Sequence, residues 1–282
     1  MDNKTCLITG ATSGIGKSLA FKLANSSINL IILSRNMRKC ERVCDELLKK
    51  NEHLKIKYYV TNISSLREIR KSASLIKNDY NKLDILINNA GAKFNKYFLS
   101  DDGFELTFAT NYLGHFLLTM ELLGLLKSSS QGRIINISSS SHSGGNIINN
   151  IQKPAVYDSG DAYRNSKLAM IYFTHKLSSI LGDTNVTVNA VDPGHAATKI
   201  KLNNGILPWL KHYFDFGIRG KLISASKAAD AILIPAIEES YSKTTGQYLH
   251  NGRLTKSSQI SYDNETAEDL FELSLNLCGL KK

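Results

Sequence analysis

Short apolar segments alternate with helix-like segments along the 282-residue chain. The apolar segments carry hydrophobic side chains at successive positions, and the segments between them repeat such side chains with helical spacing. Strands that are apolar on both faces need helices on both sides of the sheet, which is typical of parallel α/β sheets. We therefore predict a doubly wound α/β domain with about seven mostly parallel strands. Its expected strands are residues 6–9, 28–33, 56–60, 83–87, 133–137, 186–191 and 247–249.

The helices expected between these strands use much of the remaining chain. With 42% hydrophobic residues, the chain can bury one large core or two small ones. Because the alternation continues from end to end, we predict one domain over residues 1–282, with a cofactor-binding half of about 1–135 and a catalytic and substrate-binding half of about 136–282. The predicted helices are 15–26, 37–50, 66–80, 105–126, about 163–181 and 226–241, the last one capped by Ser226.

The composition limits the kinds of partner. The formal net charge is +10, from 35 basic and 25 acidic residues. Such an excess aids solubility and attracts anions, such as a phosphorylated cofactor or a membrane surface. No long basic run or RNA-binding motif is present, so we predict no nucleic-acid partner. No apolar stretch reaches the length of a membrane span and no signal peptide precedes the first strand, which favours a cytoplasmic protein and leaves peripheral membrane contact open.

The chain has four cysteines, Cys6, Cys40, Cys44 and Cys278, and they also favour a cytoplasmic protein. No group of histidine, aspartate or cysteine residues around them completes a metal site, so we predict structural thiols and no bound metal. Reduced thiols are typical of proteins in the cytosol.

A glycine-rich turn joins the first expected strand to the first expected helix. Gly10 permits a tight turn, Gly14 lets a pyrophosphate approach the backbone, and Gly16 allows close packing of helix and strand. Dinucleotide-binding turns have this context, although three residues separate Gly10 from Gly14 where the commonest fingerprint has one. A turn without a ligand is the alternative. We expect the cofactor to contact Gly10, Thr12, Ser13, Gly14, Ile15 and Gly16.

The end of the second strand indicates which dinucleotide is bound. An acidic residue at this place hydrogen-bonds the adenosine ribose of NAD and repels the 2′-phosphate of NADP. Here the strand ends in Ser34-Arg35 without a carboxylate, and the guanidinium of Arg35 suits a phosphate. Lys17, Arg38 or Lys39 could assist. We therefore predict NADP(H) rather than NAD(H); the alternative is that Arg35 is a solvated surface residue.

Tyr163 and Lys167 are four residues apart in an expected helix, so they share one face. A phenol is a weak acid near neutral pH, and a neighbouring ammonium favours the phenolate and lowers the pKa of the tyrosine. Such a pair can pass a proton to or from an alcohol oxygen. The pair therefore predicts chemistry on a carbonyl/alcohol pair.

The order of these motifs resembles that of the short-chain dehydrogenase/reductase family. The matching set also includes Asn88 to Gly91, Asn111, Ser139 and Asp192-Pro193-Gly194. Segments 63–67, 110–119 and 273–280 are similar to the retinol dehydrogenase-like branch. The resemblance covers essentially the whole chain, and it implies a Rossmann-type fold, a nicotinamide cofactor and a homodimer or homotetramer.

The resemblance also implies catalytic roles for four residues. Ser139 would hydrogen-bond the substrate carbonyl, although the neighbouring serines make this assignment ambiguous by one position. Tyr163 would pass its proton to the developing alkoxide. Lys167 would lower the tyrosine pKa and hold the nicotinamide ribose, and Asn111 would hold a water that resupplies the proton through Lys167.

Further cofactor contacts follow from the same resemblance. Asn62 stands where the family often has an aspartate that binds adenine, and His195-Ala196-Ala197 replace a segment with a larger apolar residue. Retinol dehydrogenases often carry a membrane anchor before the first strand, and we expect none in this protein. The implied cofactor contacts are Asn62, Ile63, Asn89, Ala90, Gly91, Pro193, Gly194 and Thr198, together with Tyr163 and Lys167.

Residues 195–224 are expected to form the substrate loop. Between residues 199 and 222, apolar and aromatic residues are interleaved with basic ones, and three glycines would permit movement. The segment could be a flap over a lipophilic substrate, a membrane-surface patch, or a dimer contact or plain helix core. The polar loop 144–158 is expected to border the same cleft, with His142 in a loop near the pocket.

The sequence therefore predicts an NADP-dependent oxidoreductase that transfers a hydride between nicotinamide and a carbonyl/alcohol pair. The expected substrate is small and lipophilic, such as an aldehyde, a ketone, a retinoid or a steroid. The alternative from another class is a non-catalytic NADP-binding redox sensor or regulator, which could dispense with the Tyr163/Lys167 pair. A light- or partner-dependent reductase of a pigment is a third interpretation within the same fold.

Overall fold

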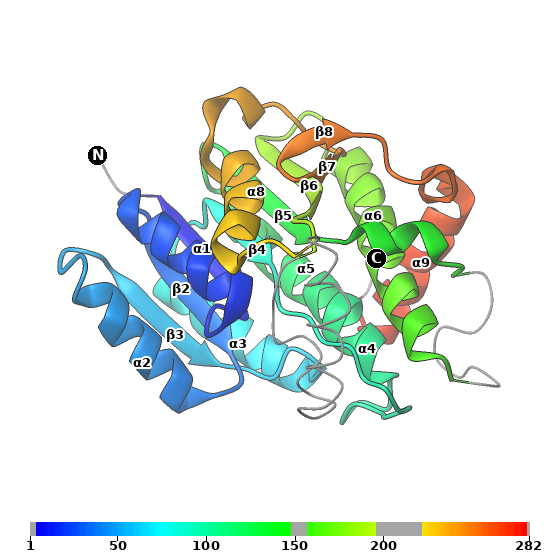
Figure 1. Ribbon diagram of the computed structural model, residues 1–282, viewed down its shortest axis with the longest axis horizontal. Helices are drawn as coiled ribbons and strands as arrows, with labels where there is room; N and C mark the ends of the chain where they lie inside the picture. The colour runs from blue at the N-terminus through cyan, green and yellow to red at the C-terminus, as the bar shows by residue number, and fades with distance from the viewer. Residues whose placement is uncertain (1–3, 148–156, 196–221, 281–282) are drawn as a thin grey trace.

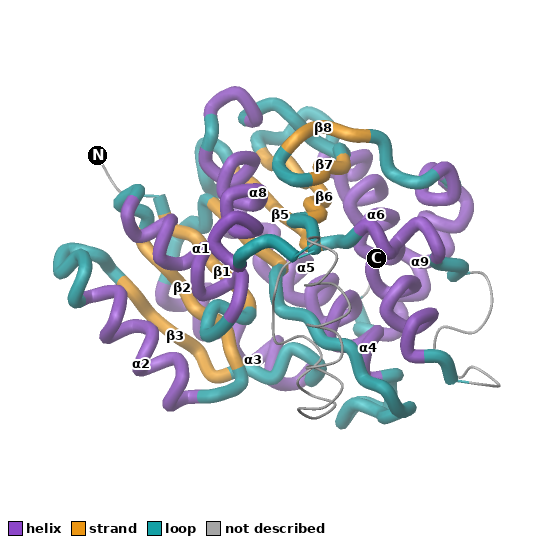
Figure 2. The backbone as a smooth tube through the Cα atoms, in the orientation of Figure 1, coloured by secondary structure: helices purple, strands orange, loops and turns teal. Residues whose placement is uncertain are grey.

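A sheet of eight strands forms the centre of the molecule, and helices cover both of its faces (Figure 1, Figure 2). The computed structural model describes residues 4–147, 157–195 and 222–280. The strand order is β3-β2-β1-β4-β5-β6-β7-β8. The strands are β1 (Thr5–Thr9), β2 (Asn29–Ser34), β3 (Ile56–Val60), β4 (Ile85–Asn88), β5 (Gly132–Ile137), β6 (Val186–Asp192), β7 (Tyr248–His250) and β8 (Arg253–Thr255).

This sheet confirms the predicted doubly wound α/β fold. β1 to β7 pair in parallel, whereas β8 pairs with β7 in the antiparallel direction. The strand order reverses between β1 and β4, and sheets of this type bind ligands beside such a switch point, at the carboxyl ends of the strands. β8 was not predicted because its three residues are all exposed and form no apolar run.

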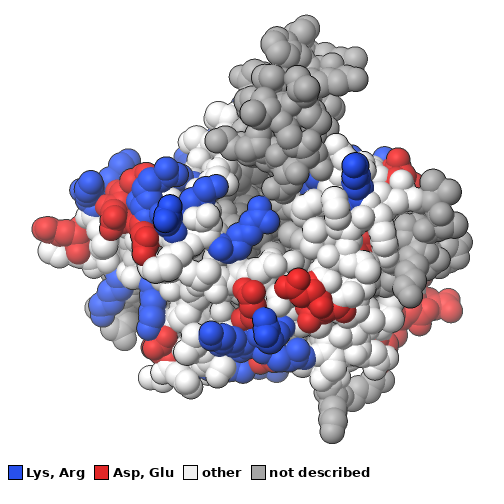
Figure 3. All heavy atoms as spheres, turned by 90° about the horizontal axis from the view of Figure 1, so that it is seen from below, with Lys and Arg blue, Asp and Glu red and all other residues white. Residues whose placement is uncertain are grey.

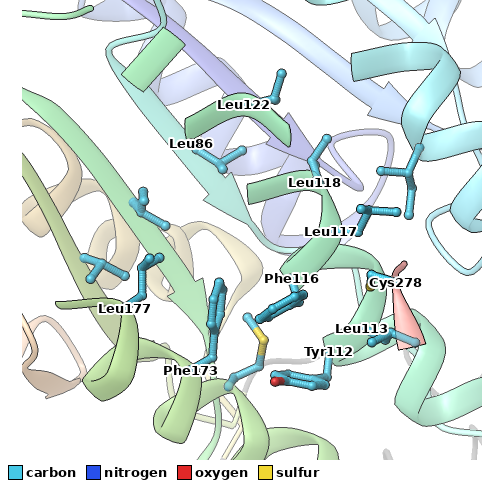
Figure 4. Close-up of a cluster of buried hydrophobic side chains, with 14 of the residues drawn as sticks. Leu86, Tyr112, Leu113, Phe116, Leu117, Leu118, Leu122, Phe173, Leu177 and Cys278 are labelled. Atoms are coloured by element: carbon cyan, nitrogen blue, oxygen red, sulfur yellow. The ribbon is translucent and has the colours of Figure 1, made fainter. Parts of the chain in front are cut away.

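The helices form two groups, one on each face of the sheet, with separate cores. Successive side chains of β1 alternate between these cores: Leu7 joins one, whereas Cys6 and Ile8 join the other. Figure 4 shows part of the first core, where the rings of Phe116 and Phe173 lie 5.0 Å apart between centroids. That core lies under α3 (Leu66–Asp79), α5 (Gly114–Lys127), α6 (Ser159–Leu181) and α9 (Asn264–Leu277), and the second core lies under α1 (Gly14–Asn25), α2 (Met37–Leu48) and α8 (Ala225–Ile237).

The helix predicted over residues 105–126 contains a π-helical segment. α4 (Leu106–Phe108) leads into the π-helical residues Ala109–Leu113 before α5 begins at Gly114. A side chain at position 114 would place its Cβ 1.8 Å from the carbonyl oxygen of Ile63, so glycine is required for this close approach. Such π-helical turns occur often at functional sites, and hydrophobic periodicity alone does not reveal them.

The C-terminal region differs from its prediction at two helices. Ser224, rather than Ser226, caps α8 by accepting the backbone N–H of Lys227, and this helix ends at Ile237. α9 was not predicted; Asp263 caps it, and it packs against α6. All four cysteines are buried and free, as expected for structural thiols. Within the described ranges, none of the helices combines the length and the apolar character of a membrane span.

Candidate active site

A cleft with a cavity volume of about 690 Å³ lies beside the segments that follow β1, β2, β4, β5 and β6. These strands end at the same edge of the sheet, next to the switch point. Thr198 and residues 196–221 of the expected substrate loop lie outside the described residues. The predicted cofactor contacts that are described all line the cleft: Gly10, Thr12, Ser13, Gly14, Ile15, Gly16, Ser34, Arg35, Asn62, Ile63, Asn89, Ala90, Gly91, Tyr163, Lys167, Pro193 and Gly194.

The glycine turn has the backbone geometry that a tight approach requires. Gly10 and Gly14 have φ values of +70° and +54°, in the left-handed region that favours glycine. A Cβ on Gly16 would lie 2.5 Å from the carbonyl oxygen of Gly10 and 2.6 Å from Nδ2 of Asn89. The turn is therefore packed directly against the segment that follows β4.

The first turn of α1 fits a phosphate group. Its N-cap residue, Ser13, makes no side-chain cap hydrogen bond, and the first turn contains no acidic residue. In contrast, Asn36, Ser65 and Asp158 accept backbone N–H groups at the starts of α2, α3 and α6. Backbone N–H groups and the helix dipole make an uncapped N-terminus a suitable place for an anion. A dinucleotide pyrophosphate fits this end of the cleft.

The end of β2 forms the wall expected for the adenosine ribose. The hydroxyls of Ser34 and Thr12 lie 3.2 Å apart, and Arg35 and Lys39 are exposed and line the cleft. Two cationic side chains at this position would complement a 2′-phosphate. On the face shown in Figure 3, basic and acidic side chains are interspersed.

Asn62, which stands where an aspartate is frequent, is engaged within its own loop. Its Oδ1 accepts from the backbone N–H of Ser64 at 3.2 Å and from the Ser64 hydroxyl at 2.9 Å. Its backbone N–H donates to Glu68 Oε2 at 2.7 Å. Both lone pairs of the amide oxygen therefore have partners in the protein.

Tyr163 and Lys167 lie on the first turns of α6 and both face the cleft. The Lys167 Nζ is 5.7 Å from the centroid of the Tyr163 ring and donates to the carbonyl oxygen of Ile137 at 2.8 Å. The Nζ of Lys93, in the segment that follows β4, is 6.0 Å from the same ring centroid and also lines the cleft. The helical spacing therefore places the Lys167 ammonium beside the ring of Tyr163.

Burial sets the proton affinities of this pair. Burial raises the pKa of Tyr163 to about 12; the hydrogen bond to Ser139 opposes that rise and the charge of Asp192 adds to it. This direction is opposite to the one predicted from the Tyr163/Lys167 pair, because burial disfavours the charged phenolate. Burial also lowers the pKa of Lys167 to about 8, and Asp192 opposes that change.

The structure distinguishes Ser139 from its neighbour Ser138. The Ser139 side chain hydrogen-bonds Tyr163 and also accepts from the backbone N–H of Ser141 at 3.2 Å. Ser138 is buried, and its hydroxyl donates to the carbonyl oxygen of Lys167 at 2.9 Å. Ser139 therefore has the geometry predicted for a hydroxyl that contacts a substrate oxygen, whereas Ser138 ties β5 to α6.

Asn111 lies behind the cleft rather than in its wall. Its Oδ1 accepts from Ala92 N–H at 2.8 Å, and its Nδ2 donates to Ala92 O and to Ser166 Oγ, both at 2.9 Å. The Ser166 hydroxyl in turn donates to the carbonyl oxygen of Tyr163 at 2.8 Å. The side chain of Asn111 thus links the segment after β4 to α6, and its backbone oxygen lies 3.2 Å from Nδ1 of His115.

Asp192 is a charged residue whose part in the site the sequence reasoning missed. It is buried at the end of β6, where Oδ1 accepts from Gly194 N–H at 2.9 Å. Its Oδ2 accepts from His250 Nδ1 at 2.8 Å and from the Tyr248 hydroxyl at 3.3 Å. An acidic residue at the end of a buried strand was a visible signal, because buried carboxylates need partners.

His142 is buried in a short 3₁₀ helix rather than placed in an open loop. Its Nδ1 donates to the Ser139 carbonyl oxygen at 2.6 Å, and its Nε2 accepts from Ser258 N–H at 3.0 Å. Burial lowers its pKa. Because both ring nitrogens bond backbone groups, His142 is oriented as a structural residue and not as a base for the Ser139 hydroxyl.

An apolar wall borders the catalytic end of the cleft. Phe94, Leu99 and Leu106 line it, and Phe98 lies beside Phe94 with the ring centroids 6.4 Å apart. Phe98 and Leu99 are 48% and 52% exposed, so two neighbouring apolar side chains lie open to solvent beside this wall. The segment from Phe94 to Leu99 has neither a glycine motif nor a periodic pattern, so its place in the cleft could not be predicted from the sequence.

The fold and these residues define a class of protein. A family model for short-chain dehydrogenases matches residues 4–205, and the chain belongs to this family. It is an oxidoreductase of the class that acts on alcohol and carbonyl groups.

Comparison with individual proteins narrows the class to the retinol dehydrogenase-like branch. The chain is 36% identical to mouse retinol dehydrogenase 13 over 283 residues, which cover 98% of this chain and 84% of that protein. It is 33% identical to human retinol dehydrogenase 12, covering 100% of this chain and 88% of that protein. A solved structure of YwfH, an NADPH-dependent reductase involved in bacilysin biosynthesis, superposes with a TM-score of 0.70 at 26% identity and covers 88% of this chain and 96% of that one.

Proposed function

We propose that the protein catalyses NADP-dependent hydride transfer between nicotinamide and a carbonyl/alcohol pair on a small lipophilic substrate. The observation that carries this proposal is the meeting of Ser139, Tyr163 and Lys167 in the same cleft as the uncapped start of α1. The nicotinamide, when bound, supplies or accepts the hydride. The rest of the chemistry is proton transfer and charge stabilisation by side chains of this chain.

Each side chain has a distinct part in the proposed reaction. In the reductive direction, the Ser139 hydroxyl hydrogen-bonds the carbonyl oxygen and Tyr163 donates its proton to the same oxygen as the alkoxide forms. The Lys167 ammonium stabilises the phenolate left behind and holds the nicotinamide ribose. Asn111 orients α6 through Ser166. As the family resemblance implies, it would also hold a water that resupplies the proton through Lys167. In the oxidative direction the same steps run in reverse.

The choice of NADP is supported by the wall at the end of β2. Arg35 and Lys39 offer two cations there, and Ser34 stands where a carboxylate would select NAD. The similar reductase YwfH is NADPH-dependent. Reduction is then the expected direction in a cell rich in NADPH.

The choice of a lipophilic substrate is supported by the apolar wall of Phe94, Leu99 and Leu106. Retinol dehydrogenases, which are named for a lipophilic alcohol, are among the relatives of this chain. The proposal includes a cytoplasmic protein with reduced, buried thiols and a homo-oligomeric state, which size-exclusion chromatography with light scattering would test.

A turnover assay tests the proposal. Purified protein is offered retinoids, steroids, aliphatic aldehydes and quinones with NADPH or NADH, and nicotinamide absorbance is followed. NADPH should support faster reduction than NADH, and equal rates would contradict the cofactor assignment. Tyr163→Phe should abolish turnover and preserve NADPH binding, because it removes the proton and keeps the ring. NADPH binding without turnover of any substrate class would favour a redox sensor instead.

A further inference from the structure

His115 is a buried histidine that touches neither the cleft nor solvent. It lies on α5, is 0% exposed, and is absent from the residues that line the cleft. Its Nε2 is 2.9 Å from the Thr9 hydroxyl and its Nδ1 is 3.2 Å from the backbone oxygen of Asn111. A single imidazole therefore contacts both the end of β1 and the π-helical segment.

The surroundings determine which nitrogen carries the proton. A carbonyl oxygen can only accept, so Nδ1 of His115 must be the donor to Asn111 O. The Thr9 hydroxyl already accepts two backbone N–H groups, from Asn89 and Ala90, both at 2.9 Å. Its own proton can then go to Nε2 at 2.9 Å, which is closer than the carbonyl oxygen of Ile87 at 3.4 Å. Burial lowers the pKa of His115 to about 3, so the ring stays neutral and keeps this one-donor, one-acceptor arrangement.

The Nε2 contact leads to the cofactor side of the cleft. Thr9 directly precedes Gly10 of the glycine turn, and its hydroxyl holds the backbone of Asn89 and Ala90 after β4. The amide of Asn89 returns a hydrogen bond to the Thr9 carbonyl oxygen at 2.8 Å. This set of bonds fixes the separation between two backbone segments that line the cleft.

The Nδ1 contact leads to the catalytic side. It holds the backbone of Asn111, whose amide bonds Ser166, and the Ser166 hydroxyl bonds the carbonyl oxygen of Tyr163. Ser166 is also the residue next to Lys167. The bonds from His115 to α6 thus reach the backbone that carries both proposed proton-transfer groups.

We propose that His115 is a positioning residue that couples the cofactor-binding strand ends to the catalytic helix through two separable hydrogen bonds. The inference rests on the proposed function for its kinetic consequences, but the hydrogen bonds can be tested without turnover. A rigid link of this kind would keep the hydride donor and the proton donor in register.

Two amide substitutions separate the two bonds. The amide of His115→Asn can reach the Nδ1 position and keep the bond to Asn111, while it loses Thr9. The longer amide of His115→Gln can reach the Nε2 position and keep Thr9, while it loses Asn111. His53→Asn, at a side chain that is 90% exposed, is the matched control and should behave as wild type.

The expected result is a division between binding and turnover. His115→Asn should raise the Kd for NADPH by about fivefold, the effect of one neutral hydrogen bond, and lower kcat by less. His115→Gln should lower kcat by about fivefold and change the NADPH Kd by less. Equal losses of both parameters in the two variants, or no loss in either, would overturn the proposal.

Amide hydrogen exchange supplies a readout that needs no substrate. His115→Asn should speed exchange at the N–H groups of Asn89 and Ala90, and His115→Gln should speed it at Ala92, whose N–H bonds Asn111. If the wild-type protein turns over no substrate but this division of exchange rates appears, the proposed function fails and the coupling stands. The same exchange rates in all proteins would reject the coupling alone.

A second pair of variants covers the case in which the His115 variants do not fold. Thr9→Val removes the hydroxyl that contacts Nε2 and should weaken NADPH binding more than it lowers kcat. Ser166→Ala removes the hydroxyl that bridges Asn111 Nδ2 and the Tyr163 carbonyl oxygen, and it should lower kcat more than it weakens binding. The absence of this contrast between Thr9→Val and Ser166→Ala would reject the coupling through His115.

Discussion

The two sides of the cleft present different kinds of chemical group. On the cofactor side, the turn from β1 to α1 offers backbone, shaped by Gly10, Gly14 and Gly16, and the start of α1 has no side-chain cap. On the catalytic side, α6 is capped by Asp158 and the chemistry belongs to side chains. Backbone sites are sensitive to added volume, whereas side-chain sites are sensitive to the loss of single polar atoms. Substitutions on the two sides should therefore fail in different ways.

After Tyr163→Phe, which should abolish turnover, the largest effect is expected from the loss of the Ser139 hydroxyl on the catalytic side. Ser139→Ala should lower kcat by about 100-fold, because it removes a hydrogen bond to the reacting oxygen, and it should leave NADPH affinity nearly unchanged. The neighbouring Ser138→Ala is the control: it removes the bond to the Lys167 carbonyl and should lower the free energy of unfolding by about 1 kcal/mol. Steady-state kinetics and urea unfolding distinguish the two. A larger loss of kcat in Ser138→Ala would reverse the assignment.

On the cofactor side the expected failure is steric. Gly16→Ala places a Cβ within 2.6 Å of both Gly10 O and Asn89 Nδ2. We expect this clash to make the free energy of NADPH binding less favourable by about 2 kcal/mol, which weakens binding by roughly 30-fold. Gly124→Ala is the matched control, since a Cβ there meets no atom within 4 Å. That variant should raise the free energy of unfolding by about 0.5–1 kcal/mol. Titration calorimetry and thermal unfolding measure both effects, and wild-type affinity in Gly16→Ala would contradict the predicted close packing.

This comparison also explains what the sequence could predict. The glycine turn and the Tyr163/Lys167 pair depend on local spacing, and the structure places all of their described residues around one cleft. The predicted strands and most helices follow from hydrophobic periodicity in the same local way. The sequence did not distinguish Ser139 from Ser138 as the serine that contacts the substrate. The distinction depends on the hydrogen bond from the Ser138 hydroxyl to the Lys167 carbonyl oxygen, and these residues are 29 positions apart.

The missed features depend on contacts between distant segments. Asp192 acquires its place in the site from His250, 58 residues later, and the π-helical turn depends on the approach of Gly114 to Ile63. β8 is held by its pairing with β7 and has no buried face of its own. Local patterns carry no information on such pairings, so the electrostatics of the site required the structure.

On the cofactor side, a smaller effect is expected on the difference between NADPH and NADH affinity. Arg35→Ala should weaken NADPH binding by about tenfold, the value of a charge-assisted hydrogen bond, and change NADH binding little. Arg38→Ala is the control, because Arg38 lies three residues further on, in α2, and is exposed but does not line the cleft. Calorimetric affinities for both cofactors measure the ratio. Equal weakening toward both would mean that Arg35 supports the fold rather than the 2′-phosphate.

The smallest effect is expected on the catalytic side, in the pH dependence of kcat. The pKa of Lys167, lowered by burial to about 8, implies that reductive kcat falls as pH rises through this value, because the ammonium is lost. Asp192 opposes that lowering and raises the Tyr163 pKa, so Asp192→Asn should move the alkaline fall to lower pH.

The control variant keeps the negative charge of Asp192 and removes one of its hydrogen-bond donors. Tyr248→Phe deletes one hydroxyl donor to Asp192, while His250 still donates to the carboxylate. The alkaline fall should then stay near its wild-type position, because Lys167 still faces a charged carboxylate at the end of β6. A pH profile of kcat measured between about pH 6 and 10 tests both variants, a range chosen to bracket ordinary lysine and perturbed active-site values. An unchanged profile in Asp192→Asn would show that the charge of Asp192 does not reach the catalytic pair, and that hydrogen bonds alone connect the end of β6 to the site.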